Sequence, residues 1–185
     1  GTVTIGSVEK FLTETAWENN WIKPIEVKNE INQSVGIIGA GPAGLAAAVT
    51  SAQRGHDVVI YDASSEIGGQ FNIAKQIPGK EEFYETLRYF KRQIELHKNI
   101  TLKLNTYVDA AALNDEAFDE VMIATGIKPR TPAIEGIEHE KVLTYIEVLK
   151  EKKPVGNKVA IIGAGGIGFD TAEYLSHGKE TPSQD

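Results

Sequence analysis

The 185-residue sequence predicts an α/β protein built on a doubly wound parallel sheet. Three observations support this prediction. Residues 35–38 and 57–61 are short, β-branched apolar runs, as expected of buried strands, and the helix-forming segment 45–52 lies between them. A strand–helix–strand succession of this length favours a right-handed crossover between parallel strands. Further along, residues 158–168 repeat the opening pattern of an apolar run followed by glycines.

The turn after the first predicted strand has the spacing G-x-G-x-x-G, formed by Gly39, Gly41 and Gly44. Gly39 would make the turn, Gly41 would let the backbone approach a pyrophosphate, and Gly44 would let the helix pack on the strand. The phosphates would lie at the helix N-terminus, where free N–H groups and the helix dipole favour an anion. Asp62 ends the second strand, where a carboxylate can accept hydrogen bonds from an adenosine ribose. The pattern predicts a Rossmann-like dinucleotide site, and a purely structural turn is the alternative.

Composition excludes several kinds of site. The chain is long enough for one domain and part of another. Without cysteine it has no disulfide, no thiol nucleophile and no cysteine-ligated zinc or iron–sulfur cluster. The net charge of −7 argues against nucleic acid or an anionic membrane as a partner. No apolar run is long enough to span a membrane and no signal peptide is recognisable, so we expect a cytoplasmic protein.

Ahead of the first strand, residues 8–20 predict a helix that Ser7 would cap. Apolar and small residues fall at helical spacing on one face, and these are Val8, Phe11, Leu12, Thr15 and Ala16. Two interpretations stay open, because such a face can dock on a partner or pack on its own domain. Residues 1–6 resemble an extended lead-in, and residues 21–33 an irregular connection.

The segment after Asp62 predicts a loop and then a long helix. Gly68 and Gly69 suit a loop whose backbone presses against a ligand, and a flexible loop is the alternative. Gln70 would donate to a ring carbonyl or be solvated. Residues 80–97 predict a helix with a core-facing stripe, made of Phe83, Leu87, Phe90, Ile94 and His97.

Two further strands are predicted at residues 100–104 and 120–124, the second of them buried. The second is followed by Thr125 and Gly126, and small residues at the carboxyl end of a strand suit the crevice where α/β sheets bind ligands. Residues 129–132 hold two prolines and predict a stiff, extended crossing between sub-domains. Residues 142–150 predict a short strand and a helix.

Residues 158–175 predict a second strand, glycine turn and helix, with Gly163, Gly165 and Gly168 in the turn. Two such units are more specific than one, because flavoprotein reductases bind two dinucleotides. The polar residues 178–185 bring no further strand with an acidic end, so we expect the second site to be half-built. The apolar run 159–162 would then need cover, from the main sheet or from a second subunit in a homo-oligomer.

Three stretches, residues 65–88, 126–132 and 156–171, carry a family resemblance. Through them, residues 35–185 resemble the flavin- and pyridine-nucleotide-binding half of the NADPH-dependent 2,4-dienoyl-CoA reductases. That family belongs with trimethylamine dehydrogenase and the old-yellow-enzyme-like flavoproteins. Residues 3–17 are instead similar to the linker before the FAD domain in glutamate synthase small subunits, which carry the same pair of nucleotide domains. Either the chain is a relative that mixes both patterns, or it is a fusion.

The resemblance implies cofactor contacts at particular residues. The pyrophosphate of FAD would be held by Gly39, Gly41, Pro42, Ala43 and Gly44. Asp62 would bind the adenosine ribose, and Gly69 and Gln70 would lie along the flavin. The place where the FAD and nicotinamide nucleotide domains meet would be lined by Ala124, Thr125 and Gly126. An incomplete NADPH phosphate site would begin with Gly163, Gly165 and Gly168.

In the full enzymes that the chain resembles, hydride passes from NADPH to FAD, and electrons continue through an iron–sulfur cluster to FMN. The sequence contains neither the FMN barrel nor the cluster cysteines, so these parts are expected as partner domains. It also lacks most of the NADPH domain and the carboxyl-terminal segment that completes the FAD fold. The resemblance therefore implies a module of a larger enzyme, too short to complete catalysis alone.

We expect three parts: a helix and linker over residues 1–34, an FAD-binding domain over 35–154, and the start of an NAD(P)-binding unit over 155–185. The expected function is that of an FAD-binding oxidoreductase module, which passes electrons from NADPH to FAD and on to a partner domain. One alternative is a non-catalytic fragment without cofactor that self-associates through its unfinished unit. Another is an NAD(P) enzyme that uses only the first site, which the Gly68–Gly69 loop and the second glycine cluster disfavour.

No catalytic side chain and no metal-ligand cluster is predicted. Hydride transfer requires positioning more than acid–base groups, because the cofactor carries the chemistry. The four histidines are far apart in the sequence, and we expect each to be structural or solvated: His56, His97, His139 and His177.

Overall fold

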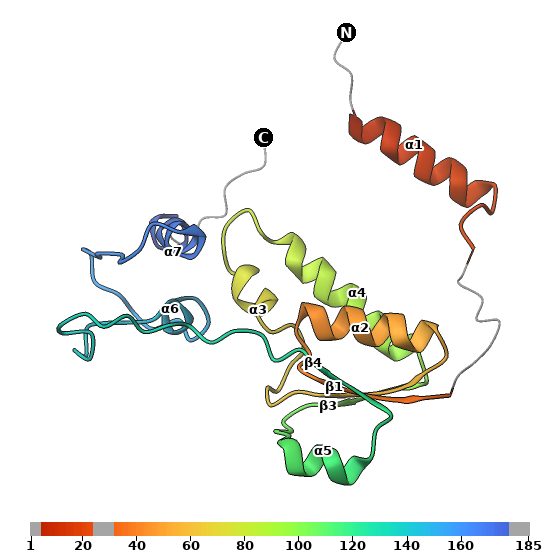
Figure 1. Ribbon diagram of the computed structural model, residues 1–185. Helices are drawn as coiled ribbons and strands as arrows, with labels where there is room; N and C mark the ends of the chain where they lie inside the picture. Colours follow the sequence, from red (N-terminus) through yellow and green to blue (C-terminus); the bar gives the residue numbers. More distant parts are fainter. Residues whose placement is uncertain (1–4, 24–31, 178–185) are drawn as a thin grey trace.

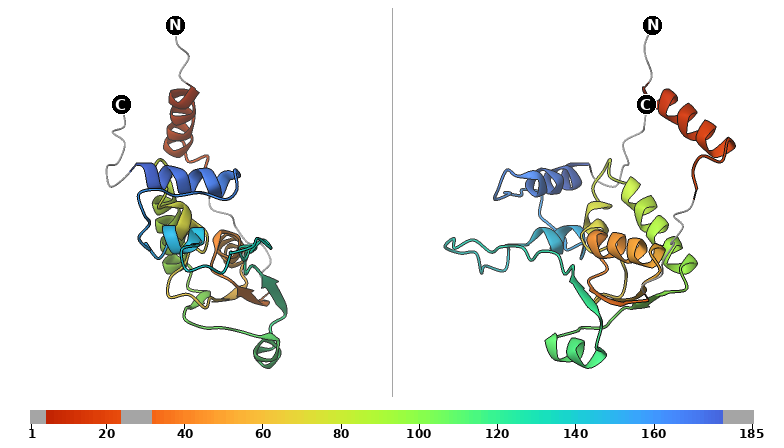
Figure 2. Two further views of the ribbon diagram at one scale, coloured as in Figure 1. Left: turned by 90° about the vertical axis from the view of Figure 1, so that its left-hand side faces the viewer. Right: turned by 45° about the vertical axis from the view of Figure 1, so that its right-hand side comes forward.

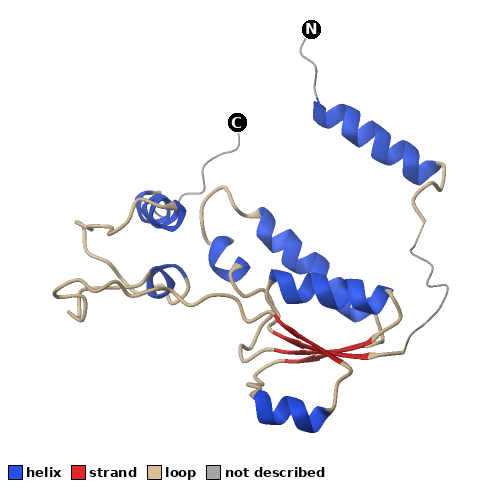
Figure 3. Cartoon of the chain, in the orientation of Figure 1, coloured by secondary structure: helices blue, strands red, loops and turns tan. Residues whose placement is uncertain are grey.

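The computed structural model describes residues 5–23 and 32–177, and its centre is a four-stranded parallel sheet (Figures 1 and 3). The strands are β1 (Ser34–Ile38), β2 (Asp57–Tyr61), β3 (Ile100–Lys103) and β4 (Glu120–Ile123). Their order in the sheet is β3-β2-β1-β4, with all three neighbouring pairs parallel. This confirms the predicted α/β class with a parallel central sheet.

Helices α2 (Pro42–Gln53) and α4 (Glu82–Leu96) cover one face of the sheet, and α5 (Ala110–Glu116) lies on the other (Figures 1 and 3). The core under α2 is fully apolar and includes Ile37, Leu45, Ala48 and Ile60, none of which is exposed to solvent. Removing these side chains from water is the main favourable contribution to the folding of the sheet with α2. The α4 stripe packs on the same core through Phe90 and Ile94, as its spacing predicted.

The strand order reverses direction between β1 and β4. From β1 the chain winds outward to β2 and β3, and it then returns to pair β4 with the other side of β1. In open α/β sheets, ligands bind at the carboxyl ends of the strands at such a switch point. The residues that follow β1 and β4 are the first glycine turn and Ala124, so both lie at this position.

Three strand predictions need correction. All four residues of β4 are solvent-exposed rather than buried, because little of the described chain covers this edge strand, whereas Ile100 of the other edge strand, β3, is buried. Residues 158–162 form no strand, and Val159 and Ile162 are 49% and 70% exposed. A strand needs a neighbour to take its backbone hydrogen bonds, and no described strand lies beside this run. The short strand predicted within residues 142–150 is also absent, and only a helix forms there.

A second apolar cluster joins α3 (Phe71–Ala74), α6 (Tyr145–Leu149) and α7 (Gly166–Ser176). Figure 2 shows these helices side by side at one end of the sheet. Ile73, Ile77 and Leu149 form the buried centre of the cluster. Lys80 Nζ lies 2.7 Å from both carboxylate oxygens of Asp170, an ion pair that ties α7 to the segment before α4. The segments 71–80 and 145–174 are thus packed together, although they are far apart in the sequence.

Helix α6 begins with a capping box. The Thr144 hydroxyl accepts from the Glu147 N–H at 3.3 Å, and the Glu147 carboxylate accepts from the Thr144 N–H at 2.7 Å. Lys153 Nζ, 2.6 Å from the same carboxylate, is the larger influence and, with Thr144, lowers the pKa of Glu147 to about 2 from 4.5. Because the folded pKa is lowered, the ionised carboxylate stabilises the fold above pH 4.5.

We expect this stabilisation to be lost as the pH falls from about 4.5 through about 2. A Glu147→Gln variant should therefore melt below the parent at pH 6, and the two melting temperatures should converge towards pH 2. A Glu151→Gln variant, whose carboxylate lies 3.8 Å from Lys153, is the control and should show a much smaller difference. A carboxyl-carbon NMR titration of Glu147 with a midpoint near 4.5 would contradict the prediction.

The N-terminal helix α1 runs over Ile5–Glu18, three residues earlier at its start than predicted. Ser7 therefore lies inside the helix rather than capping it. The predicted apolar face is exposed, with Phe11 at 66% and Leu12 at 60%, which does not support packing of this helix on its own domain. Among the described helices, none is both long and apolar enough to cross a bilayer. Residues 1–4, 24–31 and 178–185 lie outside the described residues.

Candidate functional site

The first glycine turn joins β1 to α2 and depends on the absence of two side chains. Gly39 has φ +112°, which L-residues rarely adopt, and its N–H donates to Tyr61 O at 2.7 Å. A Cβ atom at Gly39 would overlap the carbonyl of Ala124. A Cβ atom at Gly44 would overlap the carbonyl of Gly39, so this position sets how closely α2 packs on β1. Both glycines therefore serve the fold directly.

Gly41 differs from Gly39 and Gly44 because a Cβ atom at Gly41 would meet nothing within 4 Å. It is the N-cap of α2, in extended conformation and without a side-chain cap. The first backbone bond of the helix runs from Leu45 N–H to Gly41 O, which leaves the N–H groups of Ala43 and Gly44 without an intrahelical partner. Pro42 at the first helical position has no N–H to leave unpaired. Open space in front of free N–H groups at a helix N-terminus suits a phosphate.

Asp62 is held at the end of β2 by two backbone groups. Its Oδ2 accepts from the Ala40 N–H at 2.6 Å, and its Oδ1 accepts from the Ser64 N–H at 2.7 Å. An ionised carboxylate can accept about four hydrogen bonds, so each oxygen can still accept from a ribose hydroxyl. Sequence reasoning missed the contacts with Ala40 and Ser64, since backbone donors carry no residue-type signal.

The Gly68–Gly69 loop packs on the first glycine turn. The Gly68 N–H donates to Ala40 O at 2.7 Å, and a Cβ atom at Gly69 would lie 3.1 Å from Gly41 Cα. Both glycines have positive φ, +120° and +51°. The loop is also held by the buried side chain of Asn72, whose Nδ2 donates to Ile67 O at 2.8 Å. The two glycines thus bring the loop backbone against the turn that would hold the phosphates.

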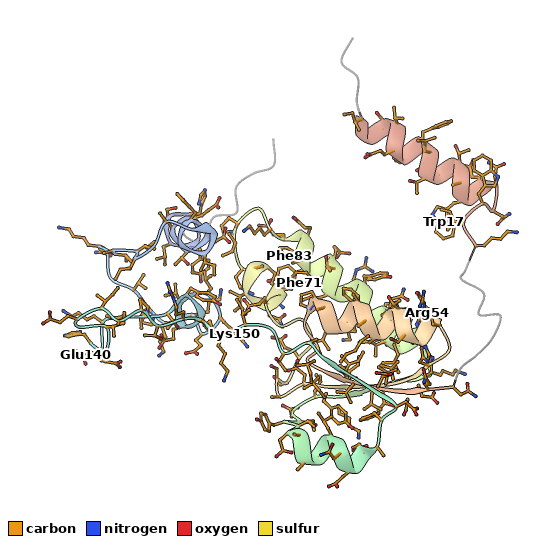
Figure 4. The ribbon with its side chains drawn as sticks, viewed as in Figure 1. Trp17, Arg54, Phe71, Phe83, Glu140 and Lys150 are labelled. Atoms are coloured by element: carbon orange, nitrogen blue, oxygen red, sulfur yellow. The ribbon has the colours of Figure 1, made fainter. Side chains whose placement is uncertain are left out.

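Directly after this loop lies a largely apolar cavity of about 220 Å³, lined by side chains of α3, α4, α6 and α7. Phe71 of α3 and Phe83 of α4 stack beside it, with ring centroids 4.5 Å apart (Figure 4). The polar lining side chains are Gln70, Tyr145 and Asp170. The Tyr145 hydroxyl is buried and has no hydrogen-bond partner among the described residues. Gln70 is half-buried, so it is neither fully solvated nor fully enclosed.

The second glycine turn repeats the geometry of the first. Gly163 has φ +112°, identical to Gly39, and Gly165 is an extended N-cap of α7, as Gly41 is of α2. A Cβ atom at Gly168 would overlap the carbonyl of Gly163, as one at Gly44 would overlap Gly39. The turn thus forms although residues 158–162, which lead directly into it, form no strand. The second turn differs from the first at Gly163, because a Cβ atom there would meet nothing within 4 Å, whereas one at Gly39 would overlap Ala124.

The structure brings part of the predicted site together at the carboxyl edge of the sheet. The Ala124 N–H donates to Ile38 O at 2.8 Å and continues the β1–β4 pairing, so Ala124 lies against Gly39. Thr125 and Gly126 are exposed just beyond it. Predicted residues gathered around the first turn are Gly39, Gly41, Pro42, Ala43, Gly44, Asp62, Gly69 and Ala124. Gly163, Gly165 and Gly168 belong to the second, separate glycine turn. The cavity has Gln70, which follows the Gly68–Gly69 loop, and Ile167, which follows the second turn, in its lining.

Comparison with known families gives one match that covers most of the chain. The family model described as "Pyridine nucleotide-disulphide oxidoreductase" matches residues 33–181. The matched region includes both glycine turns, Asp62 and the cavity.

Among curated proteins, the chain is 33% identical to the "NADH oxidase" of Thermoanaerobacter brockii, over 79% of this chain and 23% of that protein. It is 35% identical to the "Putative glutamate synthase [NADPH] small chain" of Cereibacter sphaeroides, over 92% of this chain and 45% of that protein. A solved 2-naphthoyl-CoA reductase complex superposes with a TM-score of 0.76 at 38% identity, over 86% of this chain and 24% of that chain. The chain thus spans between about a quarter and a half of the length of these proteins.

Proposed function

The chain belongs to the pyridine nucleotide-disulphide oxidoreductase family, and from this membership we propose that it is the FAD-binding electron-transfer module of a larger NADPH-dependent flavoenzyme. Members of the family are FAD- and NAD(P)H-dependent oxidoreductases. A flavin held at the first glycine turn would supply the hydride-accepting and electron-passing chemistry, because the cofactor carries that chemistry. The residues of this chain bind, orient and shield these groups.

The first glycine turn fits FAD. Space in front of Gly41, free N–H groups at Ala43 and Gly44, and the remaining acceptor capacity of Asp62 match a pyrophosphate joined to a ribose. The Gly68–Gly69 loop leads from this turn directly to Gln70 and the cavity, where a flavin ring would have apolar walls. We propose the domain division stated above: a helix and linker over 1–34, an FAD domain over 35–154, and an NAD(P) unit that begins at 155.

One observation carries the proposal: the two glycine turns have the same backbone geometry. Both have a glycine at φ +112°, an extended glycine N-cap, and a third glycine whose Cβ atom would overlap the first glycine's carbonyl. A turn needed only for packing has no reason to occur twice with an open N-cap, at Gly41 and again at Gly165. Two dinucleotides, FAD at the first turn and NADPH at the second, account for the repetition.

The electron acceptor is proposed from the relatives. The match to a 2-naphthoyl-CoA reductase supports a partner domain that reduces an unsaturated acyl-CoA thioester, as in the 2,4-dienoyl-CoA reductases. The glutamate synthase small chain type is the second candidate, because that match extends over 92% of the chain, and therefore beyond residues 33–181. For either candidate we propose that the electrons pass on to an FMN or iron–sulfur domain, whose cluster ligands would lie outside these 185 residues because they contain no cysteine.

The test is the visible absorption spectrum of the purified chain, before and after addition of FAD and removal of free flavin. Retained bands of oxidised flavin are the expected result. Anaerobic addition of NADPH should then bleach these bands if the second turn positions the nicotinamide. A chain that stays colourless after FAD addition would overturn the proposal and favour a fragment without cofactor. Such a fragment would self-associate through exposed side chains such as Ile162 and Phe169, which sedimentation would detect.

A further inference from the structure

The loop after β3 carries an aromatic side chain that the fold does not use. Tyr107 is 82% exposed, the highest value among the exposed large hydrophobic side chains of the described residues. By contrast, Tyr61 at the end of β2 is only 3% exposed and packs edge-on against Phe118. A large exposed aromatic side chain adds nothing to the core, and its ring is free to contact a ligand at the surface.

Backbone hydrogen bonds hold this loop beside the carboxylate that would bind the ribose. The Asp62 N–H donates to Lys103 O at 3.0 Å, and the Thr106 N–H donates back to Asp62 O at 2.9 Å. A third bond runs from the Asn105 N–H to Ser64 O at 2.9 Å. Asn105 has φ +53°, which turns the chain before Tyr107. Tyr107 therefore follows directly after a residue that is bonded to Asp62.

The proposed positions of the pyrophosphate and the adenosine ribose define the direction in which a dinucleotide would cross this edge of the sheet. With its pyrophosphate at the N-terminus of α2 and its ribose at Asp62, the base extends past Asp62, away from the glycine turn. Two loops border that region, residues 62–66 after β2 and residues 104–109 after β3. Tyr107 is the aromatic residue in these two loops, and the rest are small, polar or aliphatic.

We propose that the Tyr107 ring is the surface on which the adenine of the dinucleotide stacks, and that it adds to the affinity for the adenylate half of FAD. This inference rests on the proposed FAD site at the first turn. Stacking of a base on an aromatic side chain requires only the ring face, so phenylalanine at this position should serve as well as tyrosine. An aliphatic residue should not.

The test is calorimetric titration of the chain with ADP, which carries the base, ribose and pyrophosphate but no flavin. The parent and Tyr107→Phe should bind ADP equally, and Tyr107→Ala should bind about tenfold more weakly. Tyr89→Ala is the control, because Tyr89 is 50% exposed on α4 and packs against Phe90. FMN, which lacks the adenylate, should bind with the same affinity to the parent and to Tyr107→Ala.

The outcomes separate this inference from the function on which it rests. ADP binding that is unchanged in Tyr107→Ala would overturn the stacking role and leave the FAD site intact. A parent chain that binds neither ADP nor FAD would overturn the FAD site and the stacking role together. Weaker binding in both Tyr107→Ala and Tyr107→Phe would also contradict stacking, because it would point to the hydroxyl instead.

Discussion

Replacing Gly41 by valine is expected to weaken FAD binding about 100-fold, while the free energy of unfolding falls by only about 1 kcal/mol because valine is a poorer N-cap. A Cβ atom at Gly41 would meet nothing within 4 Å of the protein, so the side chain occupies the space proposed for the pyrophosphate. It would move the phosphates away from the free N–H groups of Ala43 and Gly44. Two charge-assisted hydrogen bonds of about 1.5 kcal/mol each correspond to a loss of this size.

The measurement is the FAD dissociation constant from flavin fluorescence or calorimetry, together with the melting temperature without FAD. Gly41→Ala should give an intermediate loss of affinity, because its side chain reaches less far. Melting temperatures of both variants within about 4 °C of the parent would show that the loss of affinity concerns the ligand. Unchanged FAD affinity in Gly41→Val would exclude this turn as the pyrophosphate site.

Replacing Gly44 by alanine is expected to have the largest effect on stability. The new Cβ atom would overlap the carbonyl of Gly39, and that carbonyl belongs to backbone, so no side-chain rotation relieves the overlap. Helix α2 would have to move off β1, above a core in which Ile37 and Leu45 are fully buried. We expect the free energy of unfolding to fall by about 2 to 3 kcal/mol, after allowing for the better helix propensity of alanine.

For a chain of this size, such a loss lowers the melting temperature by about 5 to 10 °C. Gly168→Ala is the matched control, because its Cβ atom would overlap the Gly163 carbonyl in the same way. That turn follows no paired strand, so it can shift, and we expect a loss below about 1 kcal/mol. Equal losses for Gly44→Ala and Gly168→Ala would contradict the explanation by close helix–strand packing.

The elements around the first turn were predictable because they depend on local patterns. Residues 35–62 carry a strand, a glycine turn, a helix and a second strand in immediate succession, and the structure has all four. Helix α5 was not predicted, although Asp109 caps it by accepting from the Ala112 N–H at 2.9 Å. A single capping residue before a short segment is too weak a signal without its apolar stripe.

The sequence-based predictions were wrong about strand burial and strand pairing, because both depend on a neighbouring segment. The sequence of β4 resembles that of a buried strand, yet Ile123 is 69% exposed, because burial depends on what covers the strand. Residues 158–162 have strand composition and no paired strand. Composition reports the preference of a residue, whereas pairing and burial need a second segment in place.

The sequence by itself determined the α/β class, the parallel pairing of β1 with β2, and the position of both glycine turns. Spacing within some thirty residues is enough for these, because turn geometry and helix packing act locally. Only the tertiary structure decided that the Ala40 N–H donates to Asp62, that the Gly68–Gly69 loop packs on Gly41, and that Thr106, the residue before Tyr107, is hydrogen-bonded to the Asp62 backbone. These contacts join segments 20 to 45 residues apart through backbone N–H and carbonyl groups. Every residue type carries a carbonyl and all but proline an N–H, so no sequence pattern announces which pairs will meet.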